Sequence, residues 1–159
     1  MKPKLIAIGY WKSIYEPELP DPANFIDLNW NTNEKNIVLQ HLKKGKPIAQ
    51  WMGTSWCRYR CKENDMGASC LTDGKYIYPE KLSHYINKHN VRLPDTFIKH
   101  ILNYKPLNIL ADLNNYDVDY ELWRKELGFN NTPNVNTYLA LTDDEIEKFN
   151  ERKKADNNI

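Results

Sequence analysis

The sequence has no apolar run long enough to cross a bilayer, few cysteines and almost no net charge. A spanning helix needs about 20 apolar residues, whereas the apolar stretch near the N-terminus covers only residues 5–8 and lacks a small-residue cleavage site after it. The three cysteines are an odd number gathered in residues 57–70, unlike the disulfide framework of a small secreted protein. We therefore expect a cytoplasmic protein that does not associate with membranes.

Motifs for nucleotide binding and for the common hydrolases are also absent. The chain contains no GxxxxGK[ST], GxGxxG, GxSxG or HExxH pattern. The sequence therefore predicts no catalytic residues and favours a non-enzymatic protein.

The composition does provide the material for one hydrophobic core. The 159 residues are 41% hydrophobic and 12% aromatic, a size and content typical of a single domain. Predicted strands and helices do not alternate regularly, which favours an α+β fold over a doubly wound sheet. We expect a small, mainly antiparallel sheet with a central β-hairpin, packed against four to five helices. The single domain should cover residues 1–150, and residues 151–159 should form a frayed tail.

A hairpin and a helix are predicted in the middle of the chain. Residues 69–78 flank Asp73-Gly74, a pair that favours a two-residue type I′ turn. Pro79 then stands where a first-turn proline could open a helix, and Asn90 could end it.

Four further helices and a strand are predicted from local signals. Asn31 lies three residues before Glu34 and should cap one helix, and Pro94-Asp95 should begin another. A short helix is expected over residues 119–127, then a strand over residues 135–141. Thr142 opens a capping box and should begin the last helix.

Two cysteines and two histidines have the outline of a zinc-binding ββα module. Cys57 and Cys61 precede the hairpin, and His84 and His89 follow it on the predicted helix. Thiolate and imidazole are the usual ligands of structural zinc. At about 100° per residue, however, the two histidines lie about 140° apart on a helix. The pattern therefore favours buried thiols, a core or capping His89 and a surface His84. Zinc is the alternative, and both histidines could bind one metal only if the helix loosened before His89.

A cysteine nucleophile is another alternative at the same residues. Arg58 and Arg60 flank Cys57 and could lower the pKa of its thiol, and His84 could act as the base. No local motif supports this alternative.

One segment mixes aromatic residues with arginines and is a candidate binding surface. Such residues are enriched at protein–protein hot spots, and they can also stack on bases or contact phosphates. An ordinary strand with inward-facing aromatics is the third interpretation. The candidate residues are Trp51, Trp56, Arg58, Tyr59 and Arg60.

The middle of the chain contains a series of distinctive strings: Trp56-Cys-Arg-Tyr, Met66-Gly, Leu71-Thr-Asp-Gly, Tyr78-Pro-Glu-Lys-Leu-Ser-His-Tyr, His89-x-Val-Arg-Leu-Pro and Phe97. Through these strings the chain resembles, from Ala23 to about Tyr104, an uncharacterised family of small bacterial proteins. The family often has tryptophan before the proline and glycine after the glutamate, where this chain has Tyr78 and Lys81. The resemblance implies a shared fold and no particular activity, and it does not cover the part from Lys105 onward.

Three function classes follow from these observations. The leading hypothesis is a bacterial binding protein whose partner is another protein, in its most specific form an immunity-type inhibitor of a toxin. Charge asymmetry supports it, since residues 34–62 hold seven bases and one acid, whereas residues 110–147 hold nine acids and two bases. The alternatives are a metal-dependent or cysteine-based domain centred on the four residues above, and a nucleic-acid-associated regulator that uses the basic segment 35–62.

Overall fold

A five-stranded mixed sheet forms the centre of the protein. The structure is a computed structural model that describes residues 1–13, 16, 18–50, 56–59, 61 and 66–126. The strand order is β2-β3-β4-β1-β5, in which the β2–β3 and β3–β4 pairs are antiparallel and the β4–β1 and β1–β5 pairs are parallel. The strands are β1 Lys4–Ala7, β2 Lys46–Gln50, β3 Ser69–Thr72, β4 Tyr76–Pro79 and β5 Asp117–Asp119.

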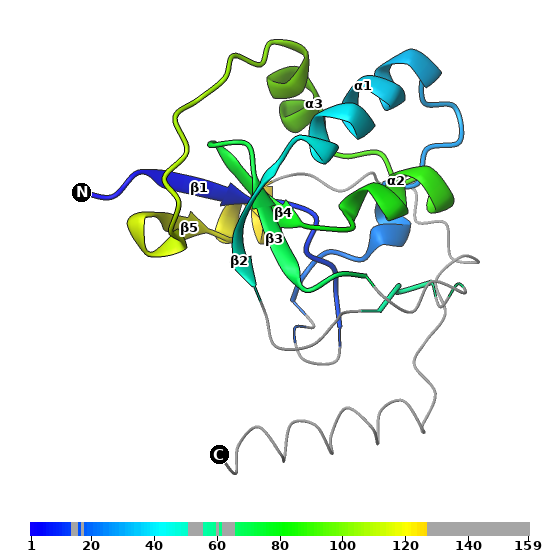
Figure 1. Cartoon of the computed structure of the whole chain (residues 1–159). Helices are drawn as coiled ribbons and strands as arrows, with labels where there is room; N and C mark the ends of the chain where they lie inside the picture. Colours follow the sequence, from blue (N-terminus) through cyan, green and yellow to red (C-terminus); the bar gives the residue numbers. More distant parts are fainter. Residues whose placement is uncertain (14–15, 17, 51–55, 60, 62–65, 127–159) are drawn as a thin grey trace.

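Alternating residues of the central strands divide the core into two clusters. On β4, Tyr76 and Tyr78 belong to the larger cluster, and Ile77 belongs to the smaller one. Leu5 and Ala7 of β1 join Ile77, as expected from the two-residue period of a strand. The larger cluster lies under the α-helices, which gather on one face of the sheet (Figure 1). The α+β class and the central hairpin are therefore confirmed, whereas the sheet is mixed rather than mainly antiparallel, because β1 pairs in parallel with both β4 and β5.

Three α-helices cover the larger cluster: α1 Thr32–Lys43, α2 Leu82–His89 and α3 Asp95–Leu102. The Asn31 side chain caps α1 by accepting the N–H of Glu34 at 3.0 Å. Pro94 stands at the N-cap of α3. Both predicted helix starts are confirmed.

The start of α2 differs from the prediction. Pro79 is the last residue of β4, where it pairs with Cys70, and the helix begins only at Leu82. The N–H of Glu80 still bonds to the carbonyl of Ser69 at 2.9 Å, so pairing with β3 holds this segment extended. The prediction that Pro79 opens the helix is wrong because a proline is also tolerated at a strand end.

The hairpin loop has three residues, Asp73 to Lys75, between β3 and β4. Gly74 has a φ of +98°, but Asp73 does not have a positive φ, so the turn is not type I′. Instead, the Asp73 carboxylate accepts the N–H groups of Lys75 and Tyr76 at 2.9 and 2.8 Å. The side chain of Asp73 therefore holds the turn.

Replacing Gly74 with alanine should destabilise the protein by roughly 1–2 kcal/mol, the cost of placing a Cβ at a left-handed position. The new Cβ would also lie 2.8 Å from the Cβ of Leu107. Urea unfolding of G74A measures this loss, with Lys75→Ala as the control, because Lys75 is exposed in the same loop. Equal stability of G74A and the native protein would contradict the turn geometry.

Shorter elements complete the described chain. The segment predicted as a helix over residues 119–127 contains a π-helical turn, η3 Leu122–Glu126. The strand predicted over 135–141, the last helix and the tail 151–159 lie outside the described residues. Within the described part, no helix is both long and apolar enough to pass through a membrane. The remaining helical segments are the 3₁₀ turns η1 Pro22–Phe25 and η2 Leu113–Asn115.

Candidate metal centre

The last turn of α2 is wider than an α-helical turn. Asn90 caps the helix with a left-handed φ of 55°, and its N–H bonds to the carbonyl of Tyr85, five residues earlier. The N–H of Val91 bonds to the same carbonyl at 3.2 Å. A wider turn rotates less per residue, so residues five apart come closer to one face. This is the loosening that His84 and His89 need to approach one another.

The two histidines meet the two cysteines beside this helix end. The rings of His84 and His89 have centroids 5.1 Å apart. The Sγ atom of Cys57 lies 3.3 Å from Nε2 of His89, and the Sγ atom of Cys61 lies 3.2 Å from Nε2 of His84. One ligand atom from each residue lies within 4.8 Å of all the others. These four residues could hold a metal ion, and the prediction that His84 points away from His89 is wrong.

Arg58 holds the cysteine segment against the rest of the protein. Its guanidinium donates to the carbonyl oxygens of Lys12 at 2.8 Å, Trp56 at 2.9 Å and Trp11 at 3.3 Å. Its backbone N–H donates to the Tyr85 hydroxyl at 3.0 Å. The two cysteines are therefore positioned by contacts to the N-terminal segment and to α2.

Burial controls the protonation of the ligands. Cys57 is 1% exposed, and burial raises the pKa of its thiol from 9.0 to about 11. The backbone N–H groups of Tyr59 and Cys61 act in the opposite direction, toward the thiolate. Burial, together with His84 and Lys88, lowers the pKa of His89 from 6.5 to about 4, so this imidazole is neutral at pH 7. Neutral imidazole is the form that binds a metal.

The expectation that Arg58 lowers the pKa of Cys57 is wrong. The guanidinium of Arg58 is directed at carbonyl oxygens, and the thiol is desolvated instead. Arg60 lies outside the described residues. A buried thiol with a raised pKa is a poor nucleophile, because the thiolate is the reactive form.

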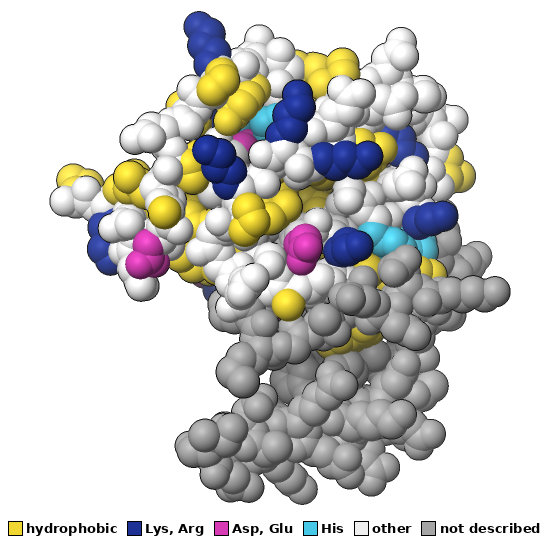
Figure 2. Space-filling model, viewed as in Figure 1, with side chains coloured by type: hydrophobic (Ala, Val, Ile, Leu, Met, Phe, Trp, Pro, Cys, Tyr) yellow, Lys and Arg dark blue, Asp and Glu magenta, His cyan; other side chains and the backbone are white. Residues whose placement is uncertain are grey.

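Of the other candidate binding residues, some lie outside the described residues and some lie near the metal centre. Trp51 lies outside the described residues. Tyr59 is buried and stacks on His89 with centroids 4.3 Å apart, and Trp56 lies under the Arg58 guanidinium at 4.3 Å. Histidine side chains lie at the surface over α2, between basic side chains (Figure 2). Of the described members of the aromatic–arginine segment, Tyr59 thus contacts the candidate metal centre directly. The contact of these residues with a partner stays a prediction.

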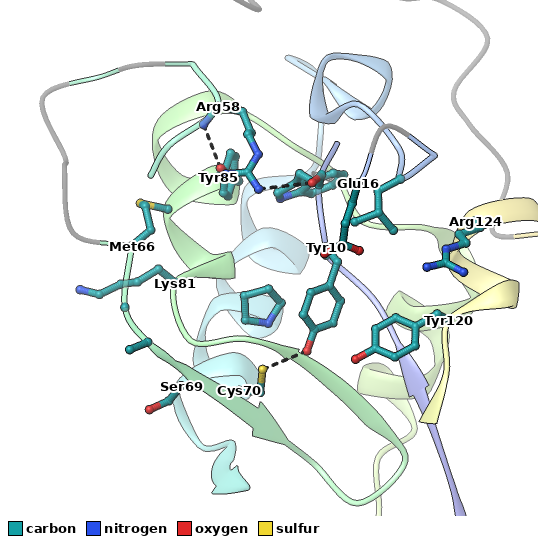
Figure 3. Close-up of a pocket in the computed structure, with 16 residues that line it drawn as sticks. Tyr10, Glu16, Arg58, Met66, Ser69, Cys70, Lys81, Tyr85, Tyr120 and Arg124 are labelled. Atoms are coloured by element: carbon teal, nitrogen blue, oxygen red, sulfur yellow. Dashed lines mark hydrogen bonds between the residues drawn. The ribbon is translucent and has the colours of Figure 1, made fainter. Parts of the chain in front are cut away.

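Cys70 does not join this cluster. It is buried on the other side of the hairpin, where its Sγ accepts the Tyr10 hydroxyl at 3.2 Å. Burial raises the pKa of Tyr10 well above its usual value, so the hydroxyl remains a donor. These two residues and Tyr120 line a cavity of about 400 Å³, with Met66, Lys81 and Arg124 also in its wall (Figure 3). Sequence reasoning missed this cavity, because its walls come from segments far apart in the chain.

Comparisons of the chain with protein-family models, with curated proteins and with solved structures give no match. The resemblance to an uncharacterised bacterial family therefore stays a prediction, and the geometry of the site carries the functional argument.

Proposed function

We propose that this is a zinc-binding protein in which the metal stabilises the fold. The observation that carries the proposal is the convergence of Cys57, Cys61, His84 and His89, with all four ligand atoms within 4.8 Å of one another. Bond lengths of 2.0–2.3 Å in a tetrahedral zinc site place the ligand atoms about 3.3–3.8 Å apart. The two sulfur–nitrogen distances of 3.3 and 3.2 Å need little adjustment to meet that geometry.

The donor set favours zinc among the divalent metals. Two thiolates and two imidazoles in tetrahedral arrangement are typical of structural zinc sites. The N–H groups that act on the Cys57 sulfur and the Tyr59 ring stacked on His89 supply the outer contacts that orient such ligands. A metal bound here would join the segment around residues 56–61 to the end of α2.

Four protein ligands support a structural role for the metal. Catalytic zinc sites keep a position open for water or substrate, whereas this set fills a tetrahedral shell. We therefore propose that the protein works by binding another protein rather than by catalysis. The internal hydrogen bonds of the Arg58 guanidinium support a protein partner over nucleic acid, because they occupy a group that would otherwise contact phosphates.

The most specific form of this proposal is an immunity-type inhibitor of a protein toxin, supported by the opposed charges of residues 34–62 and 110–147. A toxin encoded beside this gene should form a complex with the purified protein, and the complex should weaken with rising salt. Absence of binding and of protection on co-expression with that toxin would contradict this form of the proposal. That result would not contradict the proposed zinc site.

Substituting Cys57 should remove most of the thiolate coordination, and substituting Cys70 should not. Metal-free native protein titrated with Co²⁺ should develop the ultraviolet charge-transfer band of thiolate bound to cobalt. C57S should lose most of this band because it keeps one thiolate and an incomplete shell. C70S is the matched control, because Cys70 is another buried cysteine but lies outside the cluster. No charge-transfer band in the native protein, or an equal loss in both variants, would contradict the proposed site.

A further inference from the structure

All four histidines of the chain belong to two clusters, and only one of these contains cysteine. In the second, α1 supplies His41, the hairpin loop supplies Asp73 and α3 supplies His100. The Nε2 atoms of both histidines lie 2.8 Å from the same oxygen, Oδ2 of Asp73. Three potential ligand atoms thus converge from three separate elements.

The Asp73 carboxylate is fixed by the hairpin. Its Oδ1 accepts the backbone N–H groups of Lys75 and Tyr76, and its carbonyl oxygen accepts the Tyr104 hydroxyl at 2.8 Å. These contacts leave Oδ2 to face the two imidazoles. Hydrogen bonds that hold a ligating carboxylate in this way are typical of metal sites.

Aromatic rings hold both imidazoles in place. The Tyr104 ring lies 4.7 Å from His41, and the Tyr76 ring lies 4.9 Å from His100, centroid to centroid. The side chains of His41 and His100 are 9% and 11% exposed, and that of Asp73 is 3% exposed. The cluster is therefore rigid and nearly closed to solvent.

The buried carboxylate of Asp73 favours a cation in this cluster. The Asp73 side chain is 3% exposed, and its carboxylate contacts two imidazoles and two backbone N–H groups. Among the described residues, no lysine or arginine forms an ion pair with it. A buried carboxylate requires a positive partner, which is either an imidazolium or a metal ion.

We propose that His41, Asp73 and His100 form a second metal site, which takes a divalent transition-metal ion through two imidazole nitrogens and one carboxylate oxygen. Ligand–metal distances of about 2.0–2.2 Å place neighbouring ligand atoms roughly 2.8–3.1 Å apart in octahedral geometry and roughly 3.3–3.6 Å apart in tetrahedral geometry. The 2.8 Å contacts match the octahedral spacing and would open by about 0.5–0.8 Å for a tetrahedral site. Three protein ligands leave a position for water or another small ligand, which distinguishes this site from the four-ligand centre. The proposal does not depend on the Cys57 cluster.

Cobalt distinguishes the two sites, because only the four-ligand centre contains thiolate. Metal-free native protein titrated with Co²⁺ should bind two equivalents by native mass spectrometry. One should produce the thiolate charge-transfer band, and the other should produce only weak visible bands. A single bound equivalent that produces the thiolate band would overturn the second site. One equivalent without that band, lost in H100Q, would support the second site while contradicting the proposed zinc centre.

Two conservative variants separate metal binding from hydrogen bonding. H100Q can still donate a hydrogen bond to Asp73 but is a poor metal ligand, and D73N can still accept the two loop N–H groups. Each should lower the Co²⁺ affinity of the second site, the one without the thiolate band, by roughly 100-fold or more. This exceeds the 10–100-fold loss that is typical when a residue that only contacts a ligand is replaced. Lys99→Gln is the matched control, since Lys99 is exposed and adjacent to His100. Retention of two equivalents in both H100Q and D73N would overturn the assignment of these ligands.

Discussion

Chelation of the metal should lower the melting temperature of the untagged protein by roughly 8–16 °C. A ligand present at about 1,000 times its dissociation constant stabilises the folded state by about 4 kcal/mol. For a domain of about 150 residues, each kcal/mol corresponds to roughly 2–4 °C. The loss follows from the position of the centre, where the ligands join the cysteine segment to α2. Thermal unfolding followed by circular dichroism, with and without EDTA, measures it, and added zinc should reverse it.

Variants assign this effect to the Cys57 cluster. H100Q should still show a fall on chelation, because it leaves the four-ligand centre intact and removes only the contribution of the second site. C57S should melt at a lower temperature before chelation, and EDTA should lower that temperature less than in the native protein. An unchanged melting temperature after complete metal removal would contradict a structural role for zinc.

Short-range signals in the sequence predicted the helix ends well. The Asn31 cap depends on one side chain and one N–H three residues away, so the local sequence contains the whole interaction. Asn90 likewise adopts the left-handed conformation that ends α2. Pro79 was misassigned because its environment depends on pairing with Cys70 across the hairpin, and the proline itself permits either role.

The four residues of the metal centre were identified from sequence, but their arrangement was not. A helical wheel assumes the same rotation at every residue, which places His84 and His89 about 140° apart. The carbonyl of Tyr85 instead accepts the N–H groups of Asn90 and Val91, so the rotation changes in the turn that decides the geometry. The asparagine that correctly predicted the helix end was therefore also the signal that the last turn is not regular.

The second cluster has no comparable pattern in the sequence. His41 and His100 lie 32 and 27 residues from Asp73, and no fixed spacing links them. Their approach requires α1 and α3 to pack over the same hairpin loop, a tertiary arrangement that local periodicity does not encode. The Asp73-Gly74 pair indicated a turn but not that its carboxylate would face two helices.

Replacing Trp123 with alanine should destabilise the protein by about 3–5 kcal/mol, the usual cost of removing a buried large aromatic side chain. Trp123 is 0% exposed, and its ring lies 5.3 Å from that of Trp11 and 5.5 Å from that of Phe25. Its Nε1 also donates to the carbonyl oxygen of Tyr10 at 2.6 Å. The residue thus joins η3 to the N-terminal segment, although the two are far apart in the chain. Urea unfolding monitored by circular dichroism measures the loss.

Two further variants identify the source of the Trp123 effect. Trp123→Phe retains a ring and loses the N–H, so its smaller loss should approach the 1–3 kcal/mol cost of an unpaired buried carbonyl. Lys125→Ala changes an exposed residue of the same turn and should stay within about 0.5 kcal/mol of the native protein. If W123A were as stable as K125A, the η3 segment could not be packed in the core. A large loss in W123A alone would establish that the folded domain extends through this segment.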